Sequence, residues 1–431
     1  MNRVIKIFGY QFYLKEFLVI FFSYLMMENI FSWLVLPNSI ILLTLEKVTT
    51  LIIFGFVLYN FTNLKKNEKI YIGVFCFVIL RLIFESLFKY GKFFQQLTLF
   101  SVLFPVVFTI YIKCISRSLE LDFLEFLAKF YIIVYIIMMI VYGRGFSFSL
   151  NSVEMDDYGP FSGDSRVIHA RSILMMIIPL LWFFSKFLET YKIKYLLPFL
   201  FSLVVILIHQ HRSVWASAII AALVFLFATI RNQFISVPKI FNLLVVSFIV
   251  IIVSGILVAH IFPGFMNLLS DRFGDILDPT REGGTGRFRE DQREIYLSMF
   301  LKRPIFGWTF EGFDMPNPLV NWWPAKSGQH FHEGFVEMLF YHGIVGFLLK
   351  YWFLFYISFK AFSKNLSRES IVLIAFSISG FVFSFSYVLP LIFWGHVGLC
   401  LYYLEKKPSV KMVKAQIPDS ESQVDKLVSY Y

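Results

Sequence analysis

The chain of 431 residues is 58% hydrophobic and only 16% charged. Soluble domains carry about 25% charged residues, so this composition, with a mean hydropathy of +0.70, excludes an ordinary soluble fold. The sequence predicts an all-α polytopic membrane protein, because helices pair their backbone polar groups internally within lipid. The net charge is +10, but the placement of the charges matters more than their sum. We expect membrane lipids as partners and no nucleic acid.

Apolar runs long enough to cross about 30 Å of hydrocarbon recur about twelve times. Nine predicted helices fall within residues 1–262 and three within residues 339–405. A large polar loop, 263–338, precedes the tenth helix, and the polar tail 406–431 is expected to be disordered. The predicted helices are 14–36, 39–61, 70–88, 95–113, 121–142, 168–186, 194–209, 212–230, 239–262, 339–360, 370–388 and 389–405.

Lysine and arginine in the short connections predict the orientation, because cytoplasmic connections carry an excess of both. With the N-terminus in the cytoplasm, every even-numbered connection is basic, and the tail lies inside as well. The two long connections, 143–167 and 263–338, then face outward. We therefore expect the loop 263–338 to be extracytoplasmic, and periplasmic in a cell with two membranes.

The outer loop concentrates arginine within about twenty residues. Arginine offers a rigid fork of donors that suits phosphate and diphosphate. Acidic residues nearly balance these charges, so a solvated loop without a ligand is the alternative. The arginines are Arg272, Arg281, Arg287, Arg289 and Arg293.

Two further arginines lie at the outer ends of predicted helices. Arg212 follows His211 at the start of the helix 212–230, and Arg171 lies near the start of the helix 168–186. An ionisable group at such a depth costs free energy unless it faces protein or water. Both are candidates for binding an anionic substrate, or else their side chains extend to the bilayer surface.

Histidines occur as two His-x-His pairs, one ending at His211 and one formed by His330 and His332. No Cys, Asp or Glu at a usual spacing completes a ligand set, so we expect no metal. A single histidine fits a general base better, because neutral imidazole takes a proton near neutral pH. Glu333 and Glu337 are second-choice bases, and an interfacial histidine at the start of the tenth helix is the alternative.

Three motifs follow one another around these residues. Gly286-Arg287-Phe288-Arg289 starts an apolar-periodic helix that ends in a Pro-x-x-Gly turn, Arg303–Trp308, and His332 then precedes Gly343 and Gly346. This combination resembles the O-antigen ligase/O-antigen polymerase superfamily of polytopic membrane glycosyltransferases. The shared domain of that family has a Gly-Arg helix, a Pro-x-x-Gly turn and a His-Asn-x-x-Leu helix with Gly-x-x-Gly.

The resemblance is close over about residues 200–350, and Arg212–Trp215 matches an outer-edge arginine of the family. The remainder of the chain agrees only in the number of spans and in topology. Two positions depart from the pattern: Glu333 stands where the family usually has Asn, and Thr309 replaces the second glycine after the turn.

The resemblance implies an inverting, metal-independent glycosyltransferase that needs no cofactor. Its donor would be an undecaprenyl-diphosphate-linked oligosaccharide, with His332 as the general base. Arg212 and either Arg287 or Arg289 would stabilise the diphosphate that leaves. The candidates for substrate binding around them are Arg171, Arg293, His330, Glu333, Glu337 and His211.

Two reactions of this family share that chemistry. A polymerase joins one lipid-linked repeat unit to another, and we favour it here. A ligase moves the finished chain onto lipid A–core. Either enzyme would lie in the bacterial inner membrane with its site facing the periplasm, and a chain-length regulator is a further candidate partner. Outside this class, a secondary transporter is the alternative, although such proteins usually show repeated halves.

Overall fold

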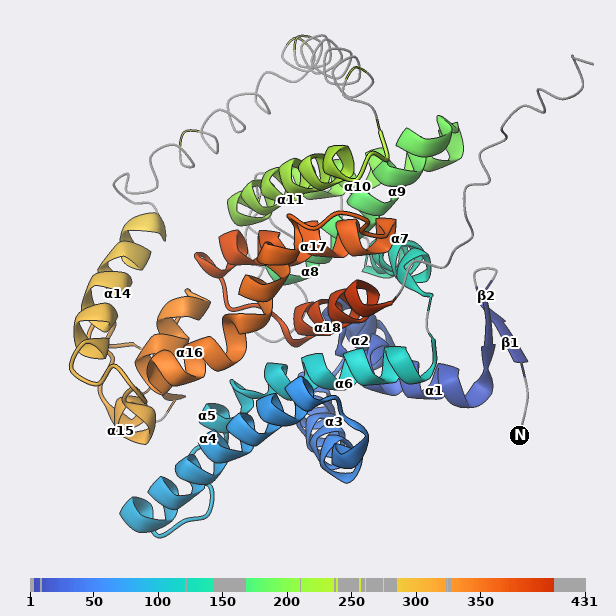
Figure 1. Cartoon of the computed structure of the whole chain (residues 1–431). Helices are drawn as coiled ribbons and strands as arrows, with labels where there is room; N and C mark the ends of the chain where they lie inside the picture. Colours follow the sequence, from blue (N-terminus) through green and yellow to red (C-terminus); the bar gives the residue numbers. More distant parts are fainter. Residues whose placement is uncertain are drawn as a thin grey trace, which may run out of the picture.

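The computed structural model describes residues 4–7, 10–120, 122–142, 168–209, 211–235, 285–322, 324 and 327–406, and the single residues 238, 256, 260 and 274. Helices dominate these segments (Figure 1). The exception is an antiparallel hairpin of β1 (Val4–Ile7) and β2 (Tyr10–Tyr13), in which Val4 pairs with Tyr13. The predicted all-α fold thus omitted these strands, and in β1 exposed and half-buried side chains alternate.

Helices α1 to α11 form the first part of the chain. A second set, α14 to α18, follows after residue 284. Their bounds are α1 (Leu14–Ser23), α2 (Asn29–Val35), α3 (Ser39–Tyr59), α4 (Lys66–Tyr90), α5 (Leu97–Ser101), α6 (Phe104–Ser118), α7 (Leu124–Tyr142), α8 (Ala170–Ile173), α9 (Ile177–Thr190), α10 (Ile193–Ile208), α11 (Arg212–Arg231), α14 (Thr285–Phe300), α15 (Thr309–Asp314), α16 (Gly334–Lys360), α17 (Arg368–Ser384) and α18 (Leu391–Glu405).

Seven helical segments in the described part of the chain are long and apolar enough to cross a membrane. The chain is therefore a multi-pass membrane protein. The predicted first span, 14–36, is broken, because its two halves meet at an angle of 109°. Glu28 starts the second half, where its carboxylate accepts a hydrogen bond of 2.7 Å from the backbone N–H of Phe31. The seven segments are α3, α4, α5 with α6, α7, α8 with α9, α11 and α16.

The total of about twelve spans stays a prediction. Helices α10, α17 and α18 have 16, 17 and 15 residues, which is short for a span. The predicted ninth span, 239–262, lies outside the described residues except for Ile256 and His260. The connection 143–167, the loop from 263 to 284 apart from Gly274, and the tail from 407 onward also lie outside them.

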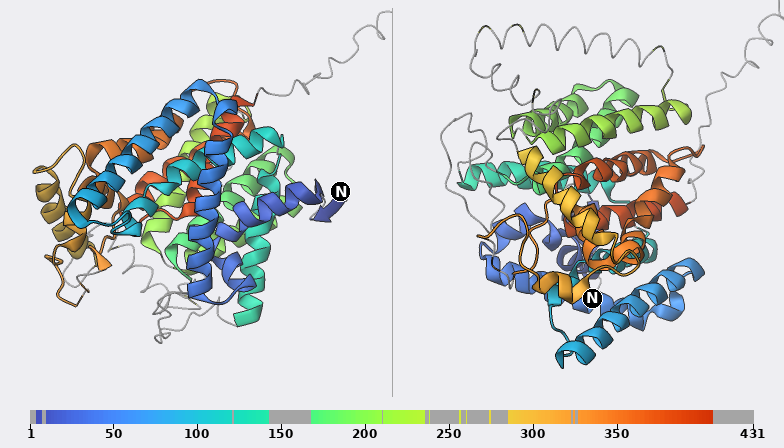
Figure 2. Two further views of the ribbon diagram at one scale, coloured as in Figure 1. Left: turned by 90° about the horizontal axis from the view of Figure 1, so that it is seen from below. Right: turned by 90° about the vertical axis from the view of Figure 1, so that its left-hand side faces the viewer.

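The helices form three layers in space (Figures 1 and 2). Helices α17 and α18 lie in the middle, with α11 packed on α17 and α6 packed on α18. Helices α9 and α10 lie on one side of them, and α3 and α4 lie on the other. The middle layer holds large buried side chains, including Phe376, Phe383 and Trp394. Helices α14 and α15 lie along one end of the bundle, against α16.

Helix α16 is interrupted at Gly343, whose φ of 60° and ψ of −163° are not helical. The turn before α15 fills the interruption, so that the N–H of Ile344 donates to the carbonyl of Pro304 at 2.8 Å. On the other side of the break, the N–H of Trp308 donates to the carbonyl of Phe340 at 2.8 Å. A Cβ on Gly343 would overlap the carbonyl of Ile305. The Pro-x-x-Gly turn and Gly343 therefore form one packing unit.

Helix α16 also begins five residues earlier than the predicted boundary at 339, directly after Glu333. The apolar run that predicts the span starts late, because Glu337 lies within the first turn of the helix. The start of α16 thus carries polar side chains into the bundle. This short helical segment positions the candidate site.

Candidate active site

Arg287 and Arg289 lie two residues apart on α14, and their side chains point in different directions. Residues two apart on a helix point about 200° away from one another. Arg289 accordingly faces the protein, and the side chain of Arg287 is exposed. Gln292 and Arg293, three and four residues after Arg289, share its face and contact the segment before α16. Of the two arginines between which the sequence left the choice open, Arg289 lines the cavity described below and Arg287 is exposed.

Gln292 holds the histidine segment through its side-chain amide. Its carbonyl oxygen accepts a hydrogen bond of 3.0 Å from the backbone N–H of His332, and its NH2 group donates to the carbonyl of His330. Gln292 is 1% exposed, so these bonds form away from competing water. The segment 330–332 is thus fixed to α14 at two points.

A salt bridge and a second glutamine fix the same segment from either side. Arg293 donates two hydrogen bonds to the carboxylate of Glu333, at 2.6 and 3.2 Å. This bond raises the pKa of Arg293 further. On the other side, the carbonyl oxygen of Gln329 accepts from the hydroxyl of Tyr296 at 2.7 Å. Glu333 and Arg293, both predicted to bind substrate, pair with one another.

A cavity of about 1000 Å³ opens beside this segment. It gathers residues from the start of α11, from α14, from the segment before α16 and from the connection between α17 and α18. Three predicted catalytic residues, Arg212, Arg289 and His332, line this cavity together. The complete lining is His211, Arg212, Ser213, Phe288, Arg289, Val320, Trp322, His330, His332, Ser386 and Tyr387.

His332 lies among aromatic rings and positive charges. Its ring centroid is 4.7 Å from that of His330 and 5.6 Å from that of Phe288. Burial lowers the pKa of His332 to about 4, with further lowering by His330, Arg289 and Arg171. The imidazole is therefore neutral near neutral pH, which is the form that can accept a proton.

The surroundings of Arg289 suit an anionic ligand. Its guanidinium carbon lies 5.6 Å above the ring of Tyr387, which orients the planar group. Its buried Nε–H has no hydrogen-bond partner among the described residues. An unsatisfied donor of a charged group is costly to bury. The free donor and the charge of Arg212 on the same cavity indicate an anionic ligand.

The remaining predicted residues lie around this cavity. His211 makes a structural hydrogen bond, since its Nε2 is 2.6 Å from the carbonyl oxygen of Ile168. Arg171, on α8, lies close enough to His332 for their charges to interact, but it does not line the cavity. Glu337, one turn into α16, lines a different cavity. Among the described residues no group of three metal-ligating side chains occurs at His332 or elsewhere.

Sequence reasoning missed three contributors to this site. Trp322 is 64% exposed, and its ring centroid lies 5.5 Å from that of His330, so it forms an aromatic wall. Tyr387 comes from the connection between α17 and α18, and Gln292 is a buried polar residue of α14. Helical spacing could have paired Gln292 with Arg289, but nothing local in the sequence brings Tyr387 to α14.

The region of the chain that matches a protein family contains most of the residues that line this cavity. No curated protein matches the chain. Residues 197–351, however, match the protein-family model described as O-Antigen ligase. This range contains Arg212, Arg289 and His332, together with the turn at Pro304 and the break at Gly343. The match supports the resemblance to the O-antigen ligase/polymerase superfamily that the sequence motifs indicate.

Proposed function

We propose that the chain is a surface-polysaccharide polymerase, an inverting glycosyltransferase on the outer face of the bacterial inner membrane. Its donor is an undecaprenyl-diphosphate-linked glycan, and its acceptor is another lipid-linked repeat unit. The observation that carries this proposal is the convergence of Arg212, Arg289 and His332 on one cavity. The two arginines can stabilise a diphosphate as it leaves. The neutral imidazole can accept a proton from the attacking hydroxyl.

The proposed reaction is a single displacement at the anomeric carbon of the donor. His332 takes the proton of an acceptor hydroxyl, and the oxygen forms a bond to that carbon. The bond between the carbon and the diphosphate oxygen breaks, and its electron pair leaves with the diphosphate. Arg212 and Arg289 stabilise the resulting charge, because donors aimed at developing charge act strongly where water is excluded.

Donor binding also adjusts the base. The positive charges of Arg289 and Arg171 contribute to the low pKa of His332. A bound diphosphate would offset these charges, and a nearby negative charge favours the protonated imidazole. The base therefore gains proton affinity when the donor is present. The acceptor is activated only after the leaving group is in place.

A ligase is the second candidate, since the matching family model carries that description. It would use the same donor chemistry with lipid A–core as the acceptor. The two functions can be distinguished in a strain that lacks the gene, by separating its lipopolysaccharide on a gel. Core with a single repeat unit supports the polymerase, whereas core without repeats and accumulation of lipid-linked polymer support the ligase. An unchanged surface glycan would contradict both functions and favour a secondary transporter.

Complementation tests the residues themselves. Arg212→Ala and His332→Ala are expected to fail to restore the polymer in the deletion strain. Arg287→Ala is the matched control, because the side chain of Arg287 is exposed outside the cavity. Full restoration by both Arg212→Ala and His332→Ala, at matched amounts of protein in the membrane, would exclude the proposed roles.

A further inference from the structure

We propose that a second cavity, next to the catalytic one, binds a sugar of the acceptor glycan. This cavity of about 790 Å³ is lined by residues of α3, α5, α6 and α16 and of the α17–α18 connection. The inference rests on the proposed glycan transfer, which requires two substrates. The catalytic cavity supplies cations and a base for the donor end of that reaction, and the second cavity is the candidate place for the other substrate.

Four charged side chains line the second cavity although it lies among apolar helices: Glu46, Lys47, Glu337 and Lys350. Lys350 is only 2% exposed, and its ammonium lies 5.7 Å from the ring centroid of Trp394. One buried carboxylate oxygen of Glu337 has no hydrogen-bond partner among the described residues. Ionisable groups at membrane depth are costly unless something satisfies them. Such a lining therefore indicates a polar ligand.

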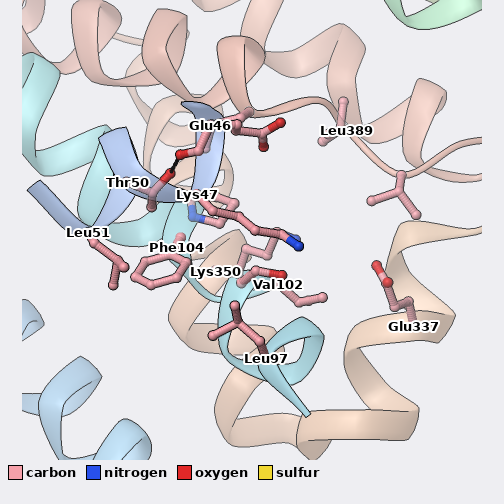
Figure 3. A pocket seen from close by; sticks show the side chains of 14 residues that line it. Glu46, Lys47, Thr50, Leu51, Leu97, Val102, Phe104, Glu337, Lys350 and Leu389 are labelled. Carbon is pink, nitrogen blue, oxygen red and sulfur yellow. Dashed lines mark hydrogen bonds between the residues drawn. The ribbon is translucent and has the colours of Figure 1, made fainter. Parts of the chain in front are cut away.

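The positions of these groups allow one ligand to meet several of them. Figure 3 shows Glu46 and Lys47 on α3 at one side of the cavity and the carboxylate of Glu337 at the other. Carboxylates only accept hydrogen bonds, and ammonium groups only donate them. A ligand that satisfies both kinds must itself donate and accept. Hydroxyl groups do both, so a polyhydroxylated ring matches this lining.

The lining of the catalytic cavity is positively charged, whereas the charges that line the second cavity balance. The two cavities therefore suit different ligands. The described residues of the catalytic lining include Arg212 and Arg289 but no carboxylate, which suits a diphosphate. The second lining balances two carboxylates, Glu46 and Glu337, against two ammonium groups. It therefore has no preference for an anion. A neutral sugar is the better match, because it needs donors and acceptors without net charge.

The two cavities are neighbours along one short segment. Tyr387 lines the catalytic cavity, and the next two residues, Val388 and Leu389, line the second one. Arg171 is close enough to both His332 and Glu337 for its charge to interact with each of them. A glycan seated in the second cavity can therefore extend past Arg171 and present a hydroxyl to the base.

The second cavity also has an edge at the lipid-facing side of the protein. Lys47 and Leu51 line it from α3, and both side chains are exposed on that helix. An acceptor attached to a lipid could keep its tail in the bilayer beside α3 while its sugar enters between α3 and α16. This route suits a lipid-linked repeat unit and lipid A–core equally, because both carry sugars on a lipid.

The test measures donor and acceptor separately with the purified full chain in proteoliposomes. One arm supplies a lipid-linked repeat unit as acceptor, and another supplies lipid A–core. Glu337→Gln and Lys47→Gln are expected to raise the KM for the acceptor that is used by about ten- to hundredfold, since each removes a hydrogen bond to a charged group. The KM for the donor is expected to change less than about twofold. Lys129→Gln, a lysine paired with Glu125 on α7, is the matched control.

The possible outcomes separate the two proposals. If the wild type transfers glycan but both variants keep its acceptor KM, the second cavity is not the acceptor site. An equal rise in donor KM and acceptor KM would also overturn the inference, because it would indicate a general defect. Lys47 is exposed, so its replacement does not depend on repacking the core. If the wild type transfers no glycan to either acceptor, the proposed function itself fails.

Discussion

The side-chain oxygen of Gln292 accepts a hydrogen bond of 3.0 Å from the backbone N–H of His332. A helix that lies outside the bundle thereby fixes the position of the candidate base. The same amide also binds the carbonyl of His330. Gln292 is therefore a positioning residue, which acts on the reaction through His332 without lining the cavity itself.

Gln292→Ala is expected to lower kcat about ten- to hundredfold, because a small displacement of a catalytic group has effects of that size. The KM for the donor is expected to stay near that of the wild type, since Arg212 and Arg289 are untouched. Glu294→Ala, on the exposed face of α14, is the control. Steady-state kinetics of the purified protein measure both constants. A change confined to KM would contradict the positioning role.

Arg289 and Arg287 provide a matched pair on one helix. Arg289→Ala is expected to lower kcat about 10²- to 10³-fold, as for removal of one donor that stabilises developing charge. Arg287→Ala is expected to leave kcat within about twofold, because its side chain lies outside the cavity. Arg289→Lys should restore only part of the rate, since lysine lacks the planar fork. Equal losses for Arg287→Ala and Arg289→Ala would disprove this assignment.

The pH dependence should differ between the free and donor-bound enzyme. A general base works when it is deprotonated, so activity falls as the pH drops through its pKa. The pKa of His332 in the unliganded protein is lowered from 6.5 to about 4, so the acid limb of kcat/KM should lie well below pH 6.5. The acid limb of kcat should lie higher, because the bound diphosphate raises this pKa.

Rate profiles from about pH 4 to pH 8 would measure the two limbs. The residual activity of His332→Ala should lack the limb in kcat. Two coincident limbs would argue against coupling between donor binding and the base. A limb that persists unchanged in His332→Ala would assign the titration to another group.

A substitution at Gly343 tests the packing of the Pro-x-x-Gly turn into the break in α16. Gly343→Ala should destabilise the protein by about 2–4 kcal/mol, because only glycine readily adopts this backbone conformation and a methyl group would overlap the turn at Ile305. Gly73→Ala on α4 is the control, since its added Cβ meets no atom within 4 Å. Thermal unfolding in detergent compares the two. Equal midpoints would show that the turn accommodates the methyl group.

Thr309, which stands where the family pattern has glycine, adopts a backbone conformation that is typical of glycine. Its φ of 46° lies in the left-handed region that glycine usually occupies. Its hydroxyl donates a hydrogen bond of 2.7 Å to the carboxylate of Glu85 on α4. The sequence shows that a glycine is missing at this position. The bond to α4, which helps to hold the strained residue, becomes visible only in the fold.

The sequence alone determined that the chain is helical and spans a membrane, because twenty consecutive apolar residues have few other stable structures in lipid. It also indicated Arg212 and His332 as candidates, since charged or titratable groups at the ends of apolar runs stand out locally. The order of the motifs indicated the resemblance to the O-antigen ligase/polymerase superfamily, and the match over residues 197–351 supports it. These inferences depend on neighbours in the chain.

The tertiary structure decided the points that depend on distant neighbours. Arg289 rather than Arg287 lines the cavity because α14 packs with one particular face toward α16. Glu333 binds Arg293 because the same packing brings them together. The hydrophobic effect that drives such packing is not directional, so the local sequence does not specify which faces meet. Shape and hydrogen bonding between helices far apart in the chain select the contact.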